Sequence, residues 1–247
     1  SLTVQRYLTN RWRVRHSLGG GEAEHRARTL YLGGVAGDQV TRTQYDSNDR
    51  FANVTGTLDV IGEVYTGGIR HQLMVGADWS GTRARNGGFQ MRSLTNRISL
   101  GAPVYGHADV TPASDEWSPF ATDTRRLGVN VQDQVTLLDG ALHLLAGVRY
   151  NSYVADKHWY DTSARPESEL SVEERAFSPR FGLVYQPAEW LSTYASYAES
   201  YLVNGFDWLE PTKTVPATTG TQYEVGTKAN LLGGRLGLTV AAYQLTK

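Results

Sequence analysis

An alternation of apolar and polar residues, with a period of two, runs through much of the chain and is clearest from Leu142 to Tyr150. Every second residue there is apolar, and the residues between them are small or polar, except Leu145. Successive side chains of a β-strand point to opposite faces, so this pattern predicts strands with one apolar face. The run Leu127–Leu137 alternates in the same way, and Asp133 interrupts its apolar face.

Short turns and long polar connections separate these runs in alternation. The short turns are Thr66-Gly67-Gly68, Leu138-Asp139-Gly140, Pro187-Ala188-Glu189 and Leu232-Gly233-Gly234-Arg235, with Thr9-Asn10-Arg11 as a further candidate. The long connections cover residues 33–48, 85–122, 157–174 and 202–218. Long loops without structure are uncommon in a compact domain, whereas an outer-membrane barrel has short periplasmic turns and long extracellular loops.

Strand length favours the same architecture. The runs Asn53–Val64 and Ile69–Ala84 have 12 and 16 residues, against about 5–6 in ordinary sheets. We count about ten strands, of which roughly 9–11 residues each would cross the membrane. The predicted fold is therefore all-β, an antiparallel transmembrane β-barrel segment of about ten strands.

Composition is compatible with this prediction. The mean hydropathy is −0.40, and no stretch approaches the roughly 20 apolar residues of a spanning helix. The chain contains 14 Tyr and 6 Trp, which suit membrane interfaces. One aromatic set lies near the short turns and another at the far strand ends, as in the two girdles of a barrel: Trp12, Tyr65, Tyr185 and Trp190, then Trp79, Tyr150, Tyr153, Tyr197 and Tyr201. A soluble sandwich with aromatic core residues is the alternative.

Several classes of function find no support. The chain has no Cys and a formal net charge of −1, so thiol chemistry is absent and nothing indicates a nucleic-acid partner. The six histidines are scattered without metal-ligand spacing, so we expect no metal site and no cofactor. The acidic pairs Asp115/Glu116 and Glu173/Glu174 lie in predicted loops, where surface charge or binding of divalent ions linked to lipopolysaccharide is expected. We therefore do not expect an enzyme.

The segment Phe177–Ser200 reads FSPRFGLVYQPAEWLSTYASYAES. It resembles a stretch shared by TonB-dependent siderophore receptors, S-P-R-x-G-L-x-Y-x-P followed by W-L-S-x-Y-A-S-Y. Four further segments resemble that family in the same order: Thr66–Asp78 (TGGIRHQLMVGAD), Pro103–Gly106 (PVYG), Gly128–Tyr150 (GVNVQDQ to LLAGVRY) and Gly220–Leu232 (GTQYEVGTKANLL). The similarity is greatest to receptors of the ferrichrome and ferripyoverdine kind.

The resemblance implies a 22-stranded barrel in the bacterial outer membrane, with a plug domain in its lumen. Residues 1–247 would then be a partial TonB-dependent receptor β-barrel domain that lacks the plug and the C-terminal strands. The implied function is import of a ferric siderophore. The implied partners are that ligand, the TonB-ExbB-ExbD complex acting through the absent N-terminal region, and outer-membrane lipid with lipopolysaccharide.

Loop aromatic and basic residues are the predicted ligand-binding set, because a siderophore encloses its iron and presents an organic surface. The set is Arg83, Arg85, Tyr105, Trp117, Phe120, Trp159, Tyr160, Phe206 and Trp208. Charged residues on the predicted lumen face are expected to contact the plug: Arg149, Arg180, Glu224 and Lys228. The rival functions are a receptor for cobalamin or haem, a receptor that also signals, a passive porin, an outer-membrane esterase or phospholipase, and an adhesin.

Overall fold

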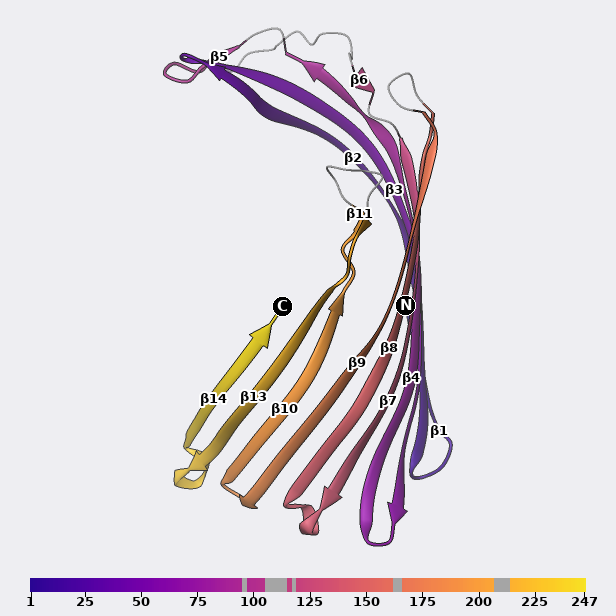
Figure 1. Cartoon of the computed structure of the whole chain (residues 1–247), viewed down its shortest axis with the longest axis vertical. Coiled ribbons are helices and arrows are strands. Elements are labelled where there is room, and N and C mark those ends of the chain that lie inside the picture. The colour runs from indigo at the N-terminus through magenta and orange to yellow at the C-terminus, as the bar shows by residue number, and fades with distance from the viewer. Residues whose placement is uncertain (95–96, 105–114, 117–118, 162–165, 207–213) are drawn as a thin grey trace.

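The chain forms one long, strongly curved antiparallel sheet (Figure 1). The structure is a computed structural model that describes residues 1–94, 97–104, 115–116, 119–161, 166–206 and 214–247. Within these residues, no helix has the length and apolar character needed to cross a membrane. The strands are β1 (Leu2–Tyr7), β2 (Trp12–Ala36), β3 (Gln39–Thr66), β4 (Ile69–Ser93), β5 (Ile98–Ser99), β6 (Asp115–Glu116), β7 (Phe120–Leu137), β8 (Leu142–Trp159), β9 (Ser168–Ala188), β10 (Leu191–Leu202), β11 (Gly205–Phe206), β12 (Thr214–Val215), β13 (Thr218–Leu231) and β14 (Leu236–Thr246).

The main strands pair with their neighbours in chain order, β1-β2-β3-β4-β7-β8-β9-β10-β13-β14. The short β5 and β6 pair with β3 and β4, and β11 pairs with β12 in a separate sheet. The predicted antiparallel wall of about ten strands is confirmed. Its short turns gather at the lower end of Figure 1, and they include the predicted ones around Thr9, Gly67, Asp139 and Gly233.

Three of the predicted long connections are shorter than expected. The prediction of a long connection at 33–48 is wrong, because β2 and β3 continue to a tight turn at Gly37 and Asp38. β4, β8 and β9 likewise extend into the ranges predicted as 85–122 and 157–174, whereas the connection at 202–218 is confirmed. Above a membrane both faces of a strand meet water, so the apolar alternation disappears although the backbone pairing continues.

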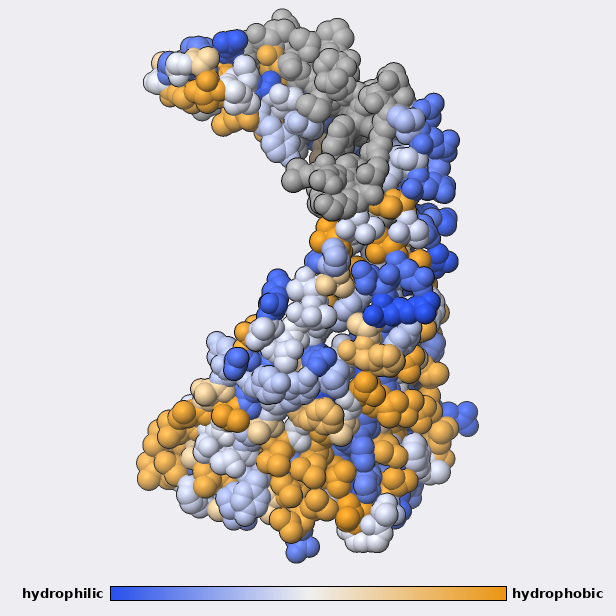
Figure 2. All heavy atoms as spheres, viewed as in Figure 1, coloured by the Kyte–Doolittle hydropathy of each residue, from blue (hydrophilic) through white to orange (hydrophobic). Residues whose placement is uncertain are grey.

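The two faces of the sheet differ in chemistry. One cross-strand row consists of Val60, Val75, Val131, Val148 and Pro179. The side chains of Val75 and Val131 are each 49% exposed, so no part of the described protein covers them. We call this the apolar face, and Figure 2 shows it as the orange area over the lower parts of the strands. Lipid contact explains its exposure, as in an outer-membrane barrel.

The adjacent row, one residue along each strand, has the opposite character. It consists of Arg15, Asp59, Gly76, Asn130, Arg149 and Ser178. We call this the polar face, and in a barrel it lines the lumen. The interruption predicted at Asp133 lies on the apolar face, where its Oδ2 is 2.7 Å from Nδ1 of His71. That partner explains how a carboxylate is tolerated there.

Aromatic side chains cover the apolar face near both of its borders. Trp12 lies over Gly62 at the turn end, and Trp79 lies over Gly56 further up. A row of rings joins Phe181, Tyr197 and Tyr223, with centroids 6.1 and 5.0 Å apart. Aromatic residues are present near both borders, but the assignments of Tyr65 and Tyr153 to the girdles are wrong. Tyr65 is an odd number of residues from Val60 and is the register partner of Arg70, so it lies on the polar face. Tyr153 is an odd number of residues from Tyr150, so it lies on the polar face, where it is 8% exposed.

One carboxylate holds the tip of the β2–β3 hairpin to the loop beyond β5. The Asp38 side chain accepts a hydrogen bond from the Ser99 hydroxyl and another, at 2.8 Å, from the Gly101 amide. The Leu100 amide also donates to the Asp38 carbonyl at 2.8 Å. The bonds from Ser99 and Gly101 hold the pKa of the Asp38 carboxyl below its ordinary value.

We predict that Gly62→Ala destabilises the barrel by about 1–3 kcal/mol. A Cβ at this position would lie 2.2 Å from the Trp12 ring, so the ring must leave its place. Gly68→Ala is the matched control, because a Cβ there meets nothing within 4 Å. Denaturant unfolding of the full-length protein in detergent measures the difference, and equal stability of the two variants would contradict this account.

A second prediction concerns pH. Because the pKa of Asp38 is lowered on folding, the contribution of its bonds is complete above the ordinary pKa of an aspartate. It is lost as the pH falls through the lowered value. A carbon NMR titration of the Asp38 carboxyl should give a midpoint below that of an exposed aspartate. Ser99→Ala should raise this midpoint because it removes the largest cause of the shift, and an unchanged midpoint would refute the assignment.

Candidate functional site

Three side chains at the upper ends of β7 and β8 form a cation–π cluster. Nζ of Lys157 lies 4.4 Å from the ring centre of Phe120 and 4.2 Å from that of Trp159. Phe120 and Trp159 are directly opposite each other in the register, and Trp159 is 4% exposed. Counting by twos from Arg149 places all three residues on the polar face. We call this cluster the lysine clamp.

A second cation–π contact lies below the clamp on the same face. The Arg126 guanidinium is 5.4 Å from the centre of the Tyr153 ring, and these residues are register partners. Tyr153 also belongs to a buried cluster with Ala155 and Val172, against which Val203 packs. Because Val203 directly follows β10, the chain that leaves this strand folds back over the polar face of β8 and β9. The clamp, Arg126 and Tyr153 together form what we call the lumenal patch.

The lumenal patch suits a particular kind of ligand. It offers two cations above aromatic rings, in a place sheltered by the wall and by the segment after β10. Such an arrangement favours an anionic ligand with flat or apolar groups, because charge attraction and ring contact act together. Among the described residues, no group of three or more His, Asp or Glu side chains is placed to hold a metal ion.

Sequence reasoning identified part of this patch. Phe120 and Trp159 are brought together as the two rings of the clamp, and the exposed Tyr160 follows, with its ring edge-on to His158 at 4.6 Å. Phe206 lies in β11, but its side chain is outside the described part of the structure. Tyr105, Trp117 and Trp208 also lie outside the described residues.

Lys157, Arg126 and Tyr153 were not among the predicted ligand-binding residues, although Tyr153 was predicted as a girdle residue. Lys157 could have been predicted from the alternation of side chains along a strand, because it precedes Trp159 by two residues and therefore lies on the same face. Residues from 157 onward were assigned to a loop, where phase has no meaning. Arg126 could have been found in the same way by counting from Gly128.

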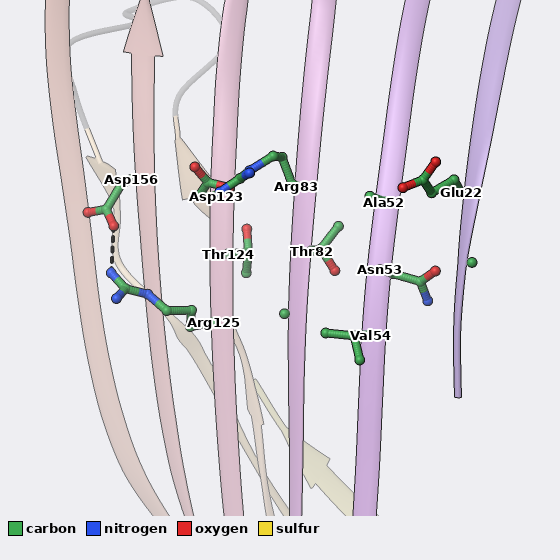
Figure 3. Close-up of a pocket in the computed structure, with 12 residues that line it drawn as sticks. Glu22, Ala52, Asn53, Val54, Thr82, Arg83, Asp123, Thr124, Arg125 and Asp156 are labelled. Atoms are coloured by element: carbon green, nitrogen blue, oxygen red, sulfur yellow. Dashed lines mark hydrogen bonds and ion pairs between the residues drawn. The ribbon is translucent and has the colours of Figure 1, made fainter. Parts of the chain in front are cut away.

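Arg83 and Arg85 lie on the opposite face from the lumenal patch. They continue the apolar face beyond Val75 and Trp79, as the unbroken register between β4 and β7 requires. Nε of Arg83 donates to Oδ1 of Asp123 at 2.7 Å, and this bond raises the pKa of Arg83 above its ordinary value. Figure 3 shows Arg83 and Asp123 in a groove that extends to Arg125 and Asp156, joined at 2.7 Å. The structure therefore separates these arginines from Phe120 and Trp159, whereas Tyr160 lines a second pocket together with Arg83 and Arg85.

The predicted plug contacts lie on the polar face, and each has a partner within the wall. Arg149 donates to both carboxylate oxygens of Asp78, at 2.6 and 2.9 Å. To reach Asp78 it crosses Gly128, where a Cβ would lie 1.8 Å from its Nη2. Arg180 similarly crosses Gly147 and donates to Gln132. These long side chains lie along the wall.

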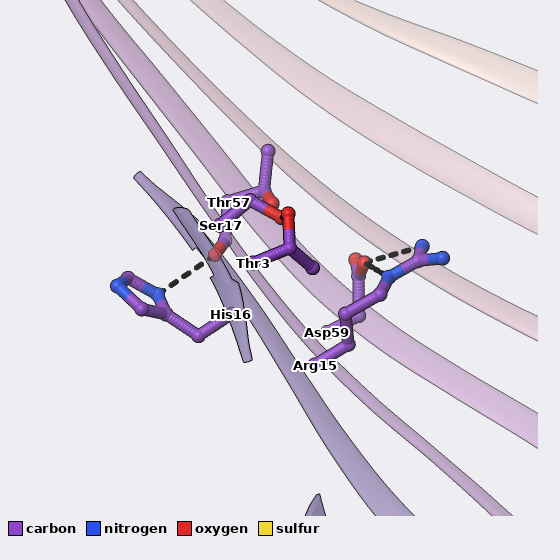
Figure 4. A network of polar contacts seen from close by, with 6 residues as sticks. All are labelled: Thr3, Arg15, His16, Ser17, Thr57 and Asp59. Carbon is purple, nitrogen blue, oxygen red and sulfur yellow. Dashed lines mark hydrogen bonds and ion pairs between the residues drawn. The ribbon is translucent and has the colours of Figure 1, made fainter. Parts of the chain in front are cut away.

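The same design continues at both ends of the sheet. The Tyr194 hydroxyl donates to Glu224 at 2.7 Å, and Nζ of Lys228 lies 5.6 Å from the centre of the Tyr194 ring. On β2 and β3, Arg15 donates to Oδ2 of its register partner Asp59 at 2.8 and 3.1 Å, as Figure 4 shows. The charged side chains of the polar face that are named here thus each have a partner on a neighbouring strand, either an opposite charge or a polar or aromatic group.

Comparisons with known proteins agree with this architecture. The family described as TonB dependent receptor-like, beta-barrel, matches residues 1–247. The metal-pseudopaline receptor CntO of Pseudomonas aeruginosa is 32% identical over 196 residues, which cover 77% of this chain and 27% of that receptor. The ferric-pyoverdine 358 receptor of Pseudomonas putida is 30% identical over 140 residues, 55% of this chain and 17% of the relative. The chain thus spans less than a third of the length of these relatives.

Solved structures show the same fold. The siderophore receptor PiuA from Acinetobacter baumannii superposes with a TM-score of 0.77 at 18% identity, over 98% of this chain and 38% of that one. The ferripyoverdine receptor of the Pseudomonas aeruginosa outer membrane gives 0.74 at 20% identity, over 98% and 32%. The alternating sheet, its polar lumen wall and the match over the whole chain lead to one assignment. The chain belongs to the β-barrel family of the TonB-dependent receptors.

Proposed function

We propose that this chain is part of the wall of an outer-membrane receptor that binds a ferric siderophore and imports it. The lysine clamp carries the proposal. Siderophores that surround ferric iron with carboxylate, catecholate or hydroxamate groups expose oxygen atoms and flat rings, and many of the complexes are anionic. A lysine held by two aromatic rings, with the Arg126 guanidinium below it, offers complementary positive charge that the buried Trp159 and Tyr153 rings hold in place.

The named relatives support a metal chelate as the ligand. Two of them are receptors for ferric pyoverdine and for metal-pseudopaline. The 32% identity to the second supports a variant of the proposal, in which the chelated ion is a metal other than iron. In either case the chelator supplies the metal ligands, so the receptor needs to recognise only the organic shell. No chemical step is required of the protein.

We further propose that Arg149, Arg180, Glu224 and Lys228 contact a plug domain in the lumen and that TonB-ExbB-ExbD supplies the energy for import. All four side chains lie on the polar face, which supports this role. Because each is already engaged within the wall, contact with a plug would use their remaining hydrogen-bonding capacity. Such contacts exchange with water at little cost, which suits a plug that must move.

The first prediction of this proposal concerns the clamp. Lys157→Met keeps the apolar stem and removes the charge, so the affinity for an anionic ferric siderophore should fall about tenfold. The matched control is Arg11→Met, which removes a cation 5.0 Å from the Tyr65 ring at the turn end of the sheet. Tryptophan fluorescence of the full-length receptor in detergent, titrated with ferric siderophores, metal-pseudopaline-type chelates, cobalamin and haem, measures the affinities. An equal affinity of wild type and Lys157→Met for the ligand that binds would exclude the clamp as its site.

The second prediction separates an importer from a porin. A strain that depends on the full-length receptor should grow on the bound ferric siderophore as its iron source only when TonB is present. Substitution of Trp159 by Ala should raise the siderophore concentration needed, because it removes one ring of the clamp. Trp190→Ala, at the turn between β9 and β10, is the control. Growth without TonB, together with passive ion flux through the reconstituted protein, would support a porin and overturn the proposal.

A further inference from the structure

The hairpin of β10 and β13 continues beyond the end of its ladder. Leu202 is opposite Thr218 in this ladder, and Gly205 is opposite Val215 in the short ladder of β11 and β12. Three residues separate these positions on each strand, so the register is unchanged across the interruption. The four strands are therefore one ribbon with a bend between its two ladders. Figure 1 shows the part beyond the bend, labelled β11, on the concave side of the sheet.

Two residues explain why the ribbon bends at this point. Pro216 has no backbone N–H to donate across the ladder. Gly205 has a φ of +78°, in the left-handed region that glycine adopts most readily. The side chain of Asn204, which lies opposite Pro216, bridges the interruption. Its Nδ2 donates to the Pro216 carbonyl at 2.6 Å and to Oγ1 of Thr218 at 2.9 Å. These bonds join the two strands at the bend and fix the angle between the two parts of the ribbon.

The bend lays the ribbon against the lumenal patch. Val203 packs against the buried cluster of Tyr153, Ala155 and Val172. Gly205 is buried, and a Cβ at this position would lie 3.9 Å from the Tyr153 hydroxyl. The start of β11 therefore rests on the Tyr153 side chain, of which 8% is exposed. The ribbon thus holds this phenol in place from the lumen side.

Tyr153 in turn orients a cation of the patch. The Arg126 guanidinium lies 5.4 Å from the centre of the Tyr153 ring, and this contact restrains a long and otherwise flexible side chain. We propose that Asn204 is a positioning residue for the siderophore site. By fixing the bend it holds Tyr153, and through Tyr153 it holds the Arg126 guanidinium ready for an anionic ligand. Preorganisation of this kind lowers the entropic cost of binding. This role rests on the proposed function of the lumenal patch.

The first test measures the bend and needs no ligand. Nitroxide labels are attached to the full-length receptor at Thr82→Cys on β4 and Thr214→Cys on β12, two exposed positions in a chain without native Cys. Asn204→Ala should lengthen and broaden the distribution of distances between the labels, because the bend relaxes. Asn204→Asp should do the same at neutral pH, because a carboxylate cannot donate to a carbonyl. An unchanged distribution in both variants would contradict the role of Asn204.

Ser200→Ala is the matched control. The Ser200 hydroxyl also donates across the hairpin, to the Gly220 carbonyl at 3.4 Å, but it does so within an unbroken ladder. Its loss should therefore leave the distribution of distances and the ligand affinity unchanged. Heat-modifiable migration on a gel confirms that each variant is folded.

A double-mutant cycle tests the path from Asn204 to the ligand. Ferric pyoverdine, ferrichrome, ferrioxamine B and a metal-pseudopaline chelate are titrated into the full-length receptor in detergent, with tryptophan fluorescence as the signal. For the chelate that binds, Asn204→Ala should lower the affinity about fivefold to tenfold, and Arg126→Met should lower it as well. The double variant should bind little more weakly than Arg126→Met alone, because Asn204 acts through Arg126.

The outcomes distinguish this role from the proposed function. If the wild type binds a chelate and Asn204→Ala binds it equally well, the positioning role is excluded and the receptor function stands. Fully additive losses in the double variant would also overturn the role, because they would show that Asn204 does not act through Arg126. Absence of binding by the wild type to every chelate would overturn the proposed function, and this role with it.

Discussion

Every backbone amide and carbonyl that faces lipid needs a hydrogen-bond partner within the protein, and this requirement organises the whole chain. Ten strands satisfy it by pairing in chain order. The pairing is nearly continuous, with register shifts at Leu32/Val35, Ser47/Asp49 and Leu191/Thr193. These shifts lie at the extracellular ends or beside a turn. A slip of one residue within the apolar row would exchange the lipid and lumen faces, so regular register there is what keeps valines outward and charges inward.

The two faces then solve different packing problems. The apolar face needs rings and branched side chains where lipid ends, and glycines at Gly56 and Gly62 give the Trp79 and Trp12 rings room to lie flat. The charged side chains of the polar face need partners within the wall itself, so that they are stabilised before any occupant enters the lumen. The bond between Arg149 and Asp78 spans two strands to meet this need. The lumenal patch stands above that region, where the wall continues into water.

Much of this fold could be predicted from the sequence, because alternation and turn residues are local signals. The strands, their antiparallel order and most turns follow from them. The full length of β2 and β3 could not be predicted from these signals, because both faces of their upper parts are polar and the alternation is lost there. The two rings of the lysine clamp were predicted as ligand-binding residues, but Lys157 was assigned to a loop and was not predicted. The partner of Arg149 depends on the joint register of β4, β7 and β8, which no local pattern contains. The face of Arg83 and Arg85 required only counting from Trp79, once β4 was known to extend that far.

The glycines of the polar face have a consequence for the width of the lumen. An arginine that projects from a barrel wall reduces the bore by most of its own length, whereas Arg149 and Arg180 lie across Gly128 and Gly147 and so stay close to the backbone. At these two positions the arginine side chains therefore do not project into the lumen. Clearance is therefore encoded in residues without side chains, and a single methyl group at Gly128 would lift a guanidinium into the space through which an occupant has to slide.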